Sequence, residues 1–143
     1  LGGDYSFAKY QLEGSRYFKV GRNGQTIALR ANGGYITGDI PVHEQFRVGG
    51  ADTLRGYSYG AFTGDKKLLL NCEYRFDVAK GVQAVVFADA GKAWKRGESV
   101  KLSELETGYG VGIRLNTPIG VMRIDYGIGE NGGRTYFSIG QAF

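Results

Sequence analysis

Apolar and polar side chains alternate at every second residue along much of this chain, and this pattern constrains the fold more than any other feature. The alternation is clearest between residues 67 and 77. There one parity is apolar and the other polar: Leu68, Leu70, Cys72, Tyr74 and Phe76 against Asn71, Glu73, Arg75 and Asp77. Because successive side chains of a β-strand point to opposite faces, this stretch predicts a strand with one apolar face.

Seven such stretches are separated by turn and loop signals, which predicts an all-β fold of about seven antiparallel strands in a meander. In chain order they are Tyr5–Val20, Thr26–Gly34, Lys67–Asp77, Val82–Trp94, Gly108–Leu115, Val121–Ile128 and Thr135–Phe143. Asn23-Gly24 is a strong signal for a hairpin turn. The short turns follow the first, third and fifth strands, so they fall on one side. Long connections are expected over residues 35–64 and 95–106.

Composition agrees with strands and excludes several classes of protein. Of 143 residues, 25 are Gly and only 2 are Pro, and 13% are aromatic, which favours strands and turns over helices. The net charge of +4 comes from scattered basic residues, so we expect no nucleic-acid partner. A single cysteine excludes a disulfide framework, and His43, the one histidine, has no partner for a metal site. No cofactor is expected.

In such a fold, the alternate residues with apolar side chains face either a closed core or lipid. Strands of roughly ten residues, short turns on one side and a terminal aromatic favour an outer-membrane β-barrel, in which the apolar face meets lipid and the polar face lines the lumen. We therefore expect one set to face outward: Leu68, Leu70, Tyr74, Phe76, Val111, Ile113, Ile124 and Ile139. The inward set is Glu73, Arg75, Asp89, Arg114 and Asp125. Tyr10, Tyr74, Trp94, Tyr109 and Phe143 are expected at the interface belt or against lipid.

The long connection contains the stretch FRVGGADTLRGY, residues 46–57. Its glycines permit backbone angles and close approaches that side chains forbid. Arg55 lies between Leu54 and Gly56, so a compact loop can present its planar fork to carboxylates or carbonyl groups. The alternative is a Gly-rich surface loop with a solvated arginine.

Several motifs together resemble one family. Phe46, Gly49 and Gly50 followed by Leu54, Arg55, Gly56 and Tyr57 resemble the inward-folded loop of BamA-type outer-membrane insertases and two-partner secretion transporters. The segments 87–91, 108–114, 117–120 and 123–126 resemble the late strands of that family. Phe137, Ile139 and the final Phe143 are similar to the C-terminal signal of outer-membrane proteins. The resemblance covers essentially all of the chain.

The resemblance implies that residues 1–143 form the C-terminal part of an outer-membrane barrel, equivalent to the last seven of sixteen strands. Earlier strands and periplasmic POTRA repeats are then expected before Leu1. An isolated chain would instead self-associate through its open sheet edges. The implied location is a bacterial-type outer membrane. The implied partners are its lipid, unfolded outer-membrane polypeptides and accessory assembly proteins.

The resemblance also implies a site. Glu73 and Asp89 share the polar parity on consecutive strands, and in the family the loop arginine meets such carboxylates in the lumen, so Arg55 is expected to pair with them. The cluster either braces the barrel or has a gating role, and the two are compatible. Gly108, Gly110 and Gly112 lack the strand-to-helix context of a phosphate loop, and we expect them to make room for another element or to relieve curvature.

Three functions remain open at this point. The first is outer-membrane protein assembly, without covalent chemistry, by pairing of incoming strands with an exposed sheet edge. The second is a membrane anchor or a polypeptide-secretion pore of the same superfamily. The third is a soluble β-barrel with its aromatic parity inside around an apolar ligand.

Overall fold

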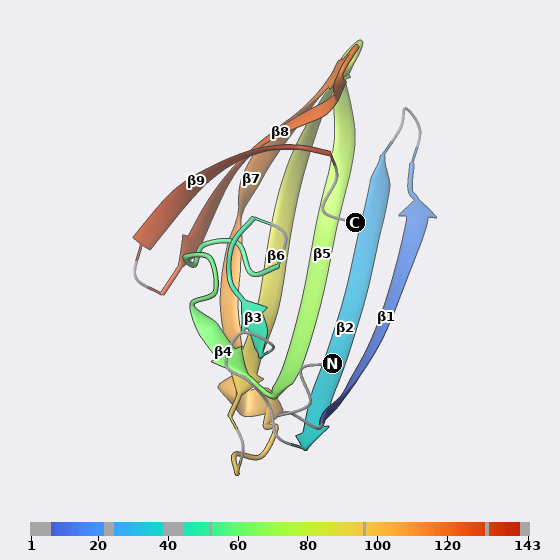
Figure 1. Cartoon of the computed structure of the whole chain (residues 1–143). Coiled ribbons are helices and arrows are strands. Elements are labelled where there is room, and N and C mark those ends of the chain that lie inside the picture. The colour runs from blue at the N-terminus through green and yellow to red at the C-terminus, as the bar shows by residue number, and fades with distance from the viewer. Residues whose placement is uncertain are drawn as a thin grey trace.

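One antiparallel sheet of seven strands dominates the computed structural model, which describes residues 7–21, 25–38, 45–51, 53–95, 97–130 and 132–140. The strand order is β1-β2-β5-β6-β7-β8-β9 (Figure 1). The strands are β1 (Phe7–Lys19), β2 (Thr26–Gly38), β5 (Lys66–Ala79), β6 (Val82–Trp94), β7 (Glu106–Thr117), β8 (Gly120–Gly129) and β9 (Gly132–Ile139). The prediction of an antiparallel seven-stranded meander is confirmed.

The long connection after β2 is more ordered than the sequence pattern predicted. β2 continues to Gly38, four residues beyond its expected end at Gly34. Two further strands, β3 (Phe46–Val48) and β4 (Phe62–Gly64), pair antiparallel in a small sheet of their own. A 3-10 helix, Leu102–Glu104, lies in the second connection, which was expected to be loop. No helix in the described ranges is long and apolar enough to cross a membrane.

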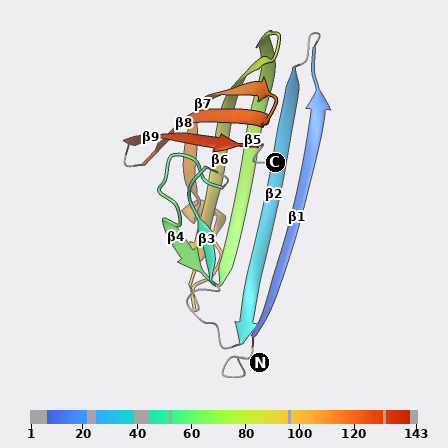
Figure 2. The same cartoon turned by 45° about the horizontal axis from the view of Figure 1, so that its top comes forward.

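The sheet is strongly curved, and the segment with β3 and β4 lies on its concave side (Figures 1 and 2). β8 and β9 arch over this segment, as Figure 2 shows. The segment that contains β3 and β4, called the insertion below, therefore lies inside the curvature of the sheet. Within the described residues β1 and β9 form the two edges of the sheet, and no backbone pairing joins them.

The two faces of the sheet carry the side chains that their parity predicted. All five residues of the inward set are buried on the concave face, with at most 9% of their surface exposed. The outward set lies on the convex face, where Val111 is 55% and Ile139 is 59% exposed. An apolar parity that is exposed on the convex face contradicts the soluble-barrel alternative.

The expectation that Trp94 lies in the interface belt or against lipid is wrong. Its side chain is 1% exposed, and its indole N–H donates to Glu104 Oε1 at 3.1 Å. The strand end that carries it is covered, because the Asp65 amide donates to the Trp94 carbonyl at 2.9 Å. Tyr10, Tyr74 and Tyr109 are exposed as expected, and Phe143 lies outside the described residues.

A small apolar core lies between the insertion and the concave face. Its members come from both: Val48, Leu54 and Tyr57 from the insertion, Leu69 and Ala93 from β5 and β6, with Phe62 packed against them. Burial of this surface favours the packed position of the insertion on the sheet. The core thus places the segment 53–57 directly over the inward side chains of the sheet.

Substitution of Val111 by Arg tests which medium the convex face meets. Val111 is near the middle of β7, and a cationic residue on a lipid-facing strand near the bilayer centre costs about 2–4 kcal/mol. We expect that loss in the free energy of unfolding, measured by denaturant titration of the complete barrel in lipid vesicles. Leu102→Arg, in the connection outside the sheet, should change it by less than about 0.5 kcal/mol. Equal effects of the two substitutions would contradict a lipid-facing surface.

Candidate functional site: a loop clamped in the concave face

Arg55 forms the centre of the site by binding two carboxylates at once. Its Nε and Nη2 atoms donate to Asp89 Oδ2 and Oδ1 at 2.7 and 2.8 Å, which is a bidentate pair. Its Nη1 atom donates to Glu73 Oε2. The backbone N–H of Arg55 also donates to Asp89 Oδ2 at 3.0 Å. One arginine therefore joins the loop to β5 and β6 through both its side chain and its backbone.

The surroundings of Arg55 hold it in place and keep it charged. The side chain is 1% exposed, and its Cζ atom lies 3.8 Å from the centre of the Phe87 ring. Burial by itself would lower the pKa of Arg55, but the hydrogen bond and charge of Asp89 and the charge of Glu73 outweigh burial and raise the pKa above its ordinary value. The guanidinium is thus a permanent charge in a fixed position.

Further charged residues extend the pair into a network. Arg114 donates from Nη2 to Glu73 Oε2 at 3.1 Å and from Nη1 to Asp125 Oδ1 at 2.6 Å. Arg75 donates to the other oxygen of Glu73 at 2.8 Å, and Arg123 Nε lies 3.1 Å from Asp125 Oδ2. Asp125 Oδ2 is 3.6 Å from Arg55 Nη1. Four strands, β5 to β8, therefore contribute charged groups to one buried network.

The loop is also fastened through its backbone carbonyls. The side chain of Asn71 donates to the Thr53 carbonyl at 2.8 Å, and Arg123 Nη2 donates to the Ala51 carbonyl at 2.5 Å. The hydroxyl of Tyr136 donates to the Tyr57 carbonyl at 2.6 Å. These contacts come from β5, β8 and β9, so the loop is attached across most of the sheet.

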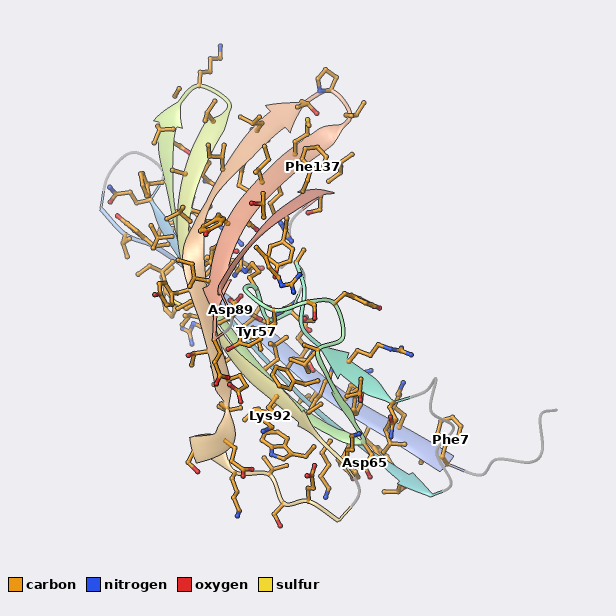
Figure 3. All side chains as sticks on the ribbon, turned by 90° about the vertical axis from the view of Figure 1, so that its left-hand side faces the viewer. Phe7, Tyr57, Asp65, Asp89, Lys92 and Phe137 are labelled. Carbon is orange, nitrogen blue, oxygen red and sulfur yellow. The ribbon has the colours of Figure 1, made fainter. Side chains whose placement is uncertain are left out.

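Tyr57 belongs to the tip of the loop, residues 54–57, and its phenol group fastens this tip to the sheet. Its hydroxyl donates to the Thr107 carbonyl at 2.8 Å and accepts the Glu130 amide at 3.2 Å. Burial raises the pKa of Tyr57 above its ordinary value, so the hydroxyl keeps its proton at neutral pH and can donate. Figure 3 labels Tyr57 and Asp89 at the place where the loop meets the sheet.

Glycines on β7 and β8 make the space that the loop occupies. A Cβ atom at Gly108 would overlap the carbonyl oxygen of Arg55. At Gly127 it would lie 2.7 Å from the Gly56 nitrogen, and at Gly129 it would lie 2.9 Å from the Tyr57 ring. Gly56 itself has a φ of 102°, and a Cβ there would be 2.7 Å from the backbone of β8. Backbone packs on backbone here, so Gly108 makes room for the loop as expected. At Gly110 and Gly112 a Cβ would instead meet β8 and inward side chains of the sheet.

Phe46, Gly49 and Gly50 shape the base of the loop. The Phe46 ring is buried, with Lys67 Nζ at 4.8 Å and Lys9 Nζ at 5.2 Å from its centre. Gly49 and Gly50 have φ values of 133° and 115°, which favour glycine, and the Gly49 amide donates to Thr53 Oγ1 at 2.8 Å. The three residues thus begin and tighten the turn that leads to Arg55.

The remaining candidate residues lie apart from this cluster. Phe137 and Ile139 are exposed on the convex face of β9, and Figure 3 shows Phe137 projecting away from the loop. Phe143 and His43 lie outside the described residues. In the described part of the chain, no group of three or more His, Cys, Asp and Glu side chains could hold a metal ion.

Several contact residues were not assigned to the loop by the sequence. Asp125 and Arg114 were expected to point inward, but nothing in their alternation connected them to Arg55. Tyr136 was not singled out at all, although it shares the inward parity of β9 with Ser138. The available signal was parity, which selects a face but does not reveal which loop covers that face.

A curved antiparallel sheet with an exposed apolar convex face and a charged concave face defines a β-barrel of the outer-membrane class. The sequence matches the Omp85 superfamily domain over residues 1–143, and the chain belongs to the Omp85 superfamily. It is accordingly an integral outer-membrane β-barrel protein.

Relatives and a solved structure agree with this assignment. The outer membrane protein assembly factor BamA of Nitratidesulfovibrio vulgaris is 31% identical over 169 aligned positions, which span all of this chain and 21% of BamA. Outer envelope protein 80 of Arabidopsis thaliana is 30% identical over 119 positions, 76% of this chain and 16% of the relative. The crystal structure of BamA from Haemophilus ducreyi lacking POTRA domains 1–3 superposes with a TM-score of 0.76 at 17% identity, covering 99% of this chain and 35% of that one. The chain thus spans about a sixth to a fifth of the length of these two relatives.

Substitution of Arg55 by Ala tests how strongly the carboxylates hold the loop. Among the described residues the hydrogen bonds to the Asp89 carboxylate come from Arg55, so R55A leaves a buried carboxylate unpaired. We expect a loss of about 3–5 kcal/mol in the free energy of unfolding of the complete barrel. The double variant R55A/D89A should lose clearly less than the sum of R55A and D89A. Additive losses would show that the two residues do not interact. Arg47→Ala, an exposed arginine in the same insertion, is the matched control.

Substitution of Gly108 by Ala tests the close approach of the loop to β7. The added methyl group would overlap the Arg55 carbonyl, and overpacking of this kind costs about 1–3 kcal/mol. We expect a protease to cleave the chain within residues 45–61 faster in G108A than in the parent protein. Gly14→Ala is the control, because no atom lies within 4 Å of a Cβ at Gly14. Equal cutting of the two variants would contradict the packed position of the loop.

Proposed function

We propose that this chain forms part of an Omp85-type barrel that assembles other polypeptides into the outer membrane. The observation that carries the proposal is the clamp of Arg55 on Glu73 and Asp89, which holds an insertion of this length inside the barrel curvature. The name of the Nitratidesulfovibrio vulgaris relative, an outer membrane protein assembly factor, supports the same function.

The proposed mechanism is strand pairing at a sheet edge, without covalent chemistry. Unpaired backbone groups in lipid cost several kcal/mol each, so an incoming strand gains most where it can pair with an open edge. β9 is an edge of the described sheet, and its residues are largely exposed. We propose that β9 contributes one side of the seam at which substrate strands enter, and that strands preceding residue 1 contribute the other.

The proposed role of the loop is to brace the inner wall next to that seam. Its contacts reach from β5 to β9, so it fixes the relative positions of five consecutive strands. Unfolded outer-membrane polypeptides, membrane lipid and accessory assembly proteins are the proposed partners.

The proposal is tested with the complete protein in proteoliposomes that receive an unfolded outer-membrane barrel polypeptide. We expect the protein to raise the rate at which the substrate becomes folded and protease-resistant above that in protein-free vesicles. R55A should lower this rate by about tenfold, since a loss of 1.4 kcal/mol already corresponds to a factor of ten. R55K should be intermediate, because Lys keeps the charge without the bidentate fork. Arg47→Ala should retain the parental rate.

The outcomes separate the alternatives. Delivery of the substrate into the vesicle interior, without its insertion, would support a secretion pore instead. No effect on the substrate at all would support an anchor. Edge pairing itself is tested with a photo-crosslinker at Thr135 of β9, which should capture the incoming strand, whereas the same group at Val86 in the central strand β6 should not.

A further inference from the structure

We propose that Tyr136 is a positioning residue that couples the docked loop tip to the edge strand β9. This inference deepens the proposed function, because the availability of β9 for pairing matters only if the edge receives substrate strands. It rests on the placement of one hydroxyl group between two backbone groups of the loop. None of the motifs found in the sequence includes Tyr136.

The Tyr136 hydroxyl makes two hydrogen bonds to adjacent residues of the tip. It accepts the backbone N–H of Gly56 at 2.9 Å and donates to the backbone carbonyl of Tyr57 at 2.6 Å. These two residues directly follow Arg55, which is fixed to β5 and β6. The four residues 54–57 are therefore held from the middle of the sheet on one side and from its edge on the other.

β9 makes few side-chain contacts with the concave side of the sheet, so the position of this strand depends strongly on Tyr136. Of the strand Gly132–Ile139 only Tyr136 and Ser138 are half-buried, and the other side chains are exposed. Backbone pairing with β8 is the remaining connection of β9 to the described sheet. A strand that is paired on one side only and makes few packing contacts depends strongly on each contact that it has.

The path of the loop makes this contact possible. Gly56 crosses directly over β8, where a Cβ atom at Gly129 would lie 2.5 Å from the Gly56 carbonyl oxygen. The loop backbone therefore passes β8 at contact distance and reaches the side chain of the next strand. Any larger residue at Gly127 or Gly129 would lift the tip away from Tyr136.

The coupling has a direct consequence for the edge. When Arg55 is clamped, Gly56 and Tyr57 hold Tyr136 and with it the angle of β9. When the tip leaves its site, Tyr136 loses both partners and β9 keeps only its pairing with β8. Loop position and edge mobility are thus linked in both directions, as any thermodynamic coupling requires.

Hydrogen exchange of the complete barrel in lipid nanodiscs tests the coupling. In Tyr136→Phe we expect the amides of residues 54–57 and 132–139 to exchange about tenfold faster, while those of β6 stay unchanged. Tyr126→Phe is the matched control, since Tyr126 lies on the convex face of β8 beside β9, and it should leave the exchange of both segments unchanged. R55A, which acts at the other end of the tip, should also accelerate β9.

Two results would overturn the proposal. In the first, R55A accelerates exchange of residues 54–57 while β9 exchanges as in the parent protein. In the second, Y126F accelerates β9 as much as Y136F does. The R55A arm decides the question even if Y136F fails to fold. Because exchange is measured without substrate, failure of the assembly assay would reject the proposed function while leaving this coupling to be judged separately.

Discussion

A guanidinium group removed from water needs carboxylates in fixed places, and the structure depends on how Arg55 meets this need. Asp89 and Glu73 supply the charges, yet both are themselves buried, where a charged group without partners is costly. Arg75 on β5, Arg114 on β7 and Asp125 on β8 complete the charge network. Arg55 therefore stabilises the buried charges of the concave face, and those same charges hold the loop in place.

Much of the sheet could be predicted because strand side chains alternate with a fixed period. Parity assigned Glu73 and Asp89 to one face and Leu70 and Val111 to the other, and turn residues separated the strands. The pairing of Arg55 with the two carboxylates was expected only through parity and family resemblance together. Neither alone connects a loop residue to strands 18 and 34 positions further along the chain.

The parts that escaped prediction depend on contacts between distant segments. Trp94 is an aromatic residue at a strand end, as interface residues often are, but the Asp65 amide and the 102–104 helix cover it. The β3–β4 pairing joins two three-residue strands that have no room to show a period. Tyr136 has the same local pattern as any inward tyrosine, so only the crossing of Gly56 over β8 reveals its partners.

The crossing of the loop over β8 also sets an order of assembly for the chain itself. The contacts of Arg55 with Glu73 and Asp89 span 18 and 34 residues, whereas those of Tyr136 with Gly56 and Tyr57 span 80 and 79. Closing a longer stretch of chain costs more entropy, which favours formation of the shorter contacts before the longer ones. The loop accordingly seats on β5 and β6 first and is locked when β9 arrives. The arrival of β9 then adds the two hydrogen bonds of Tyr136 to a loop that is already held by β5 and β6.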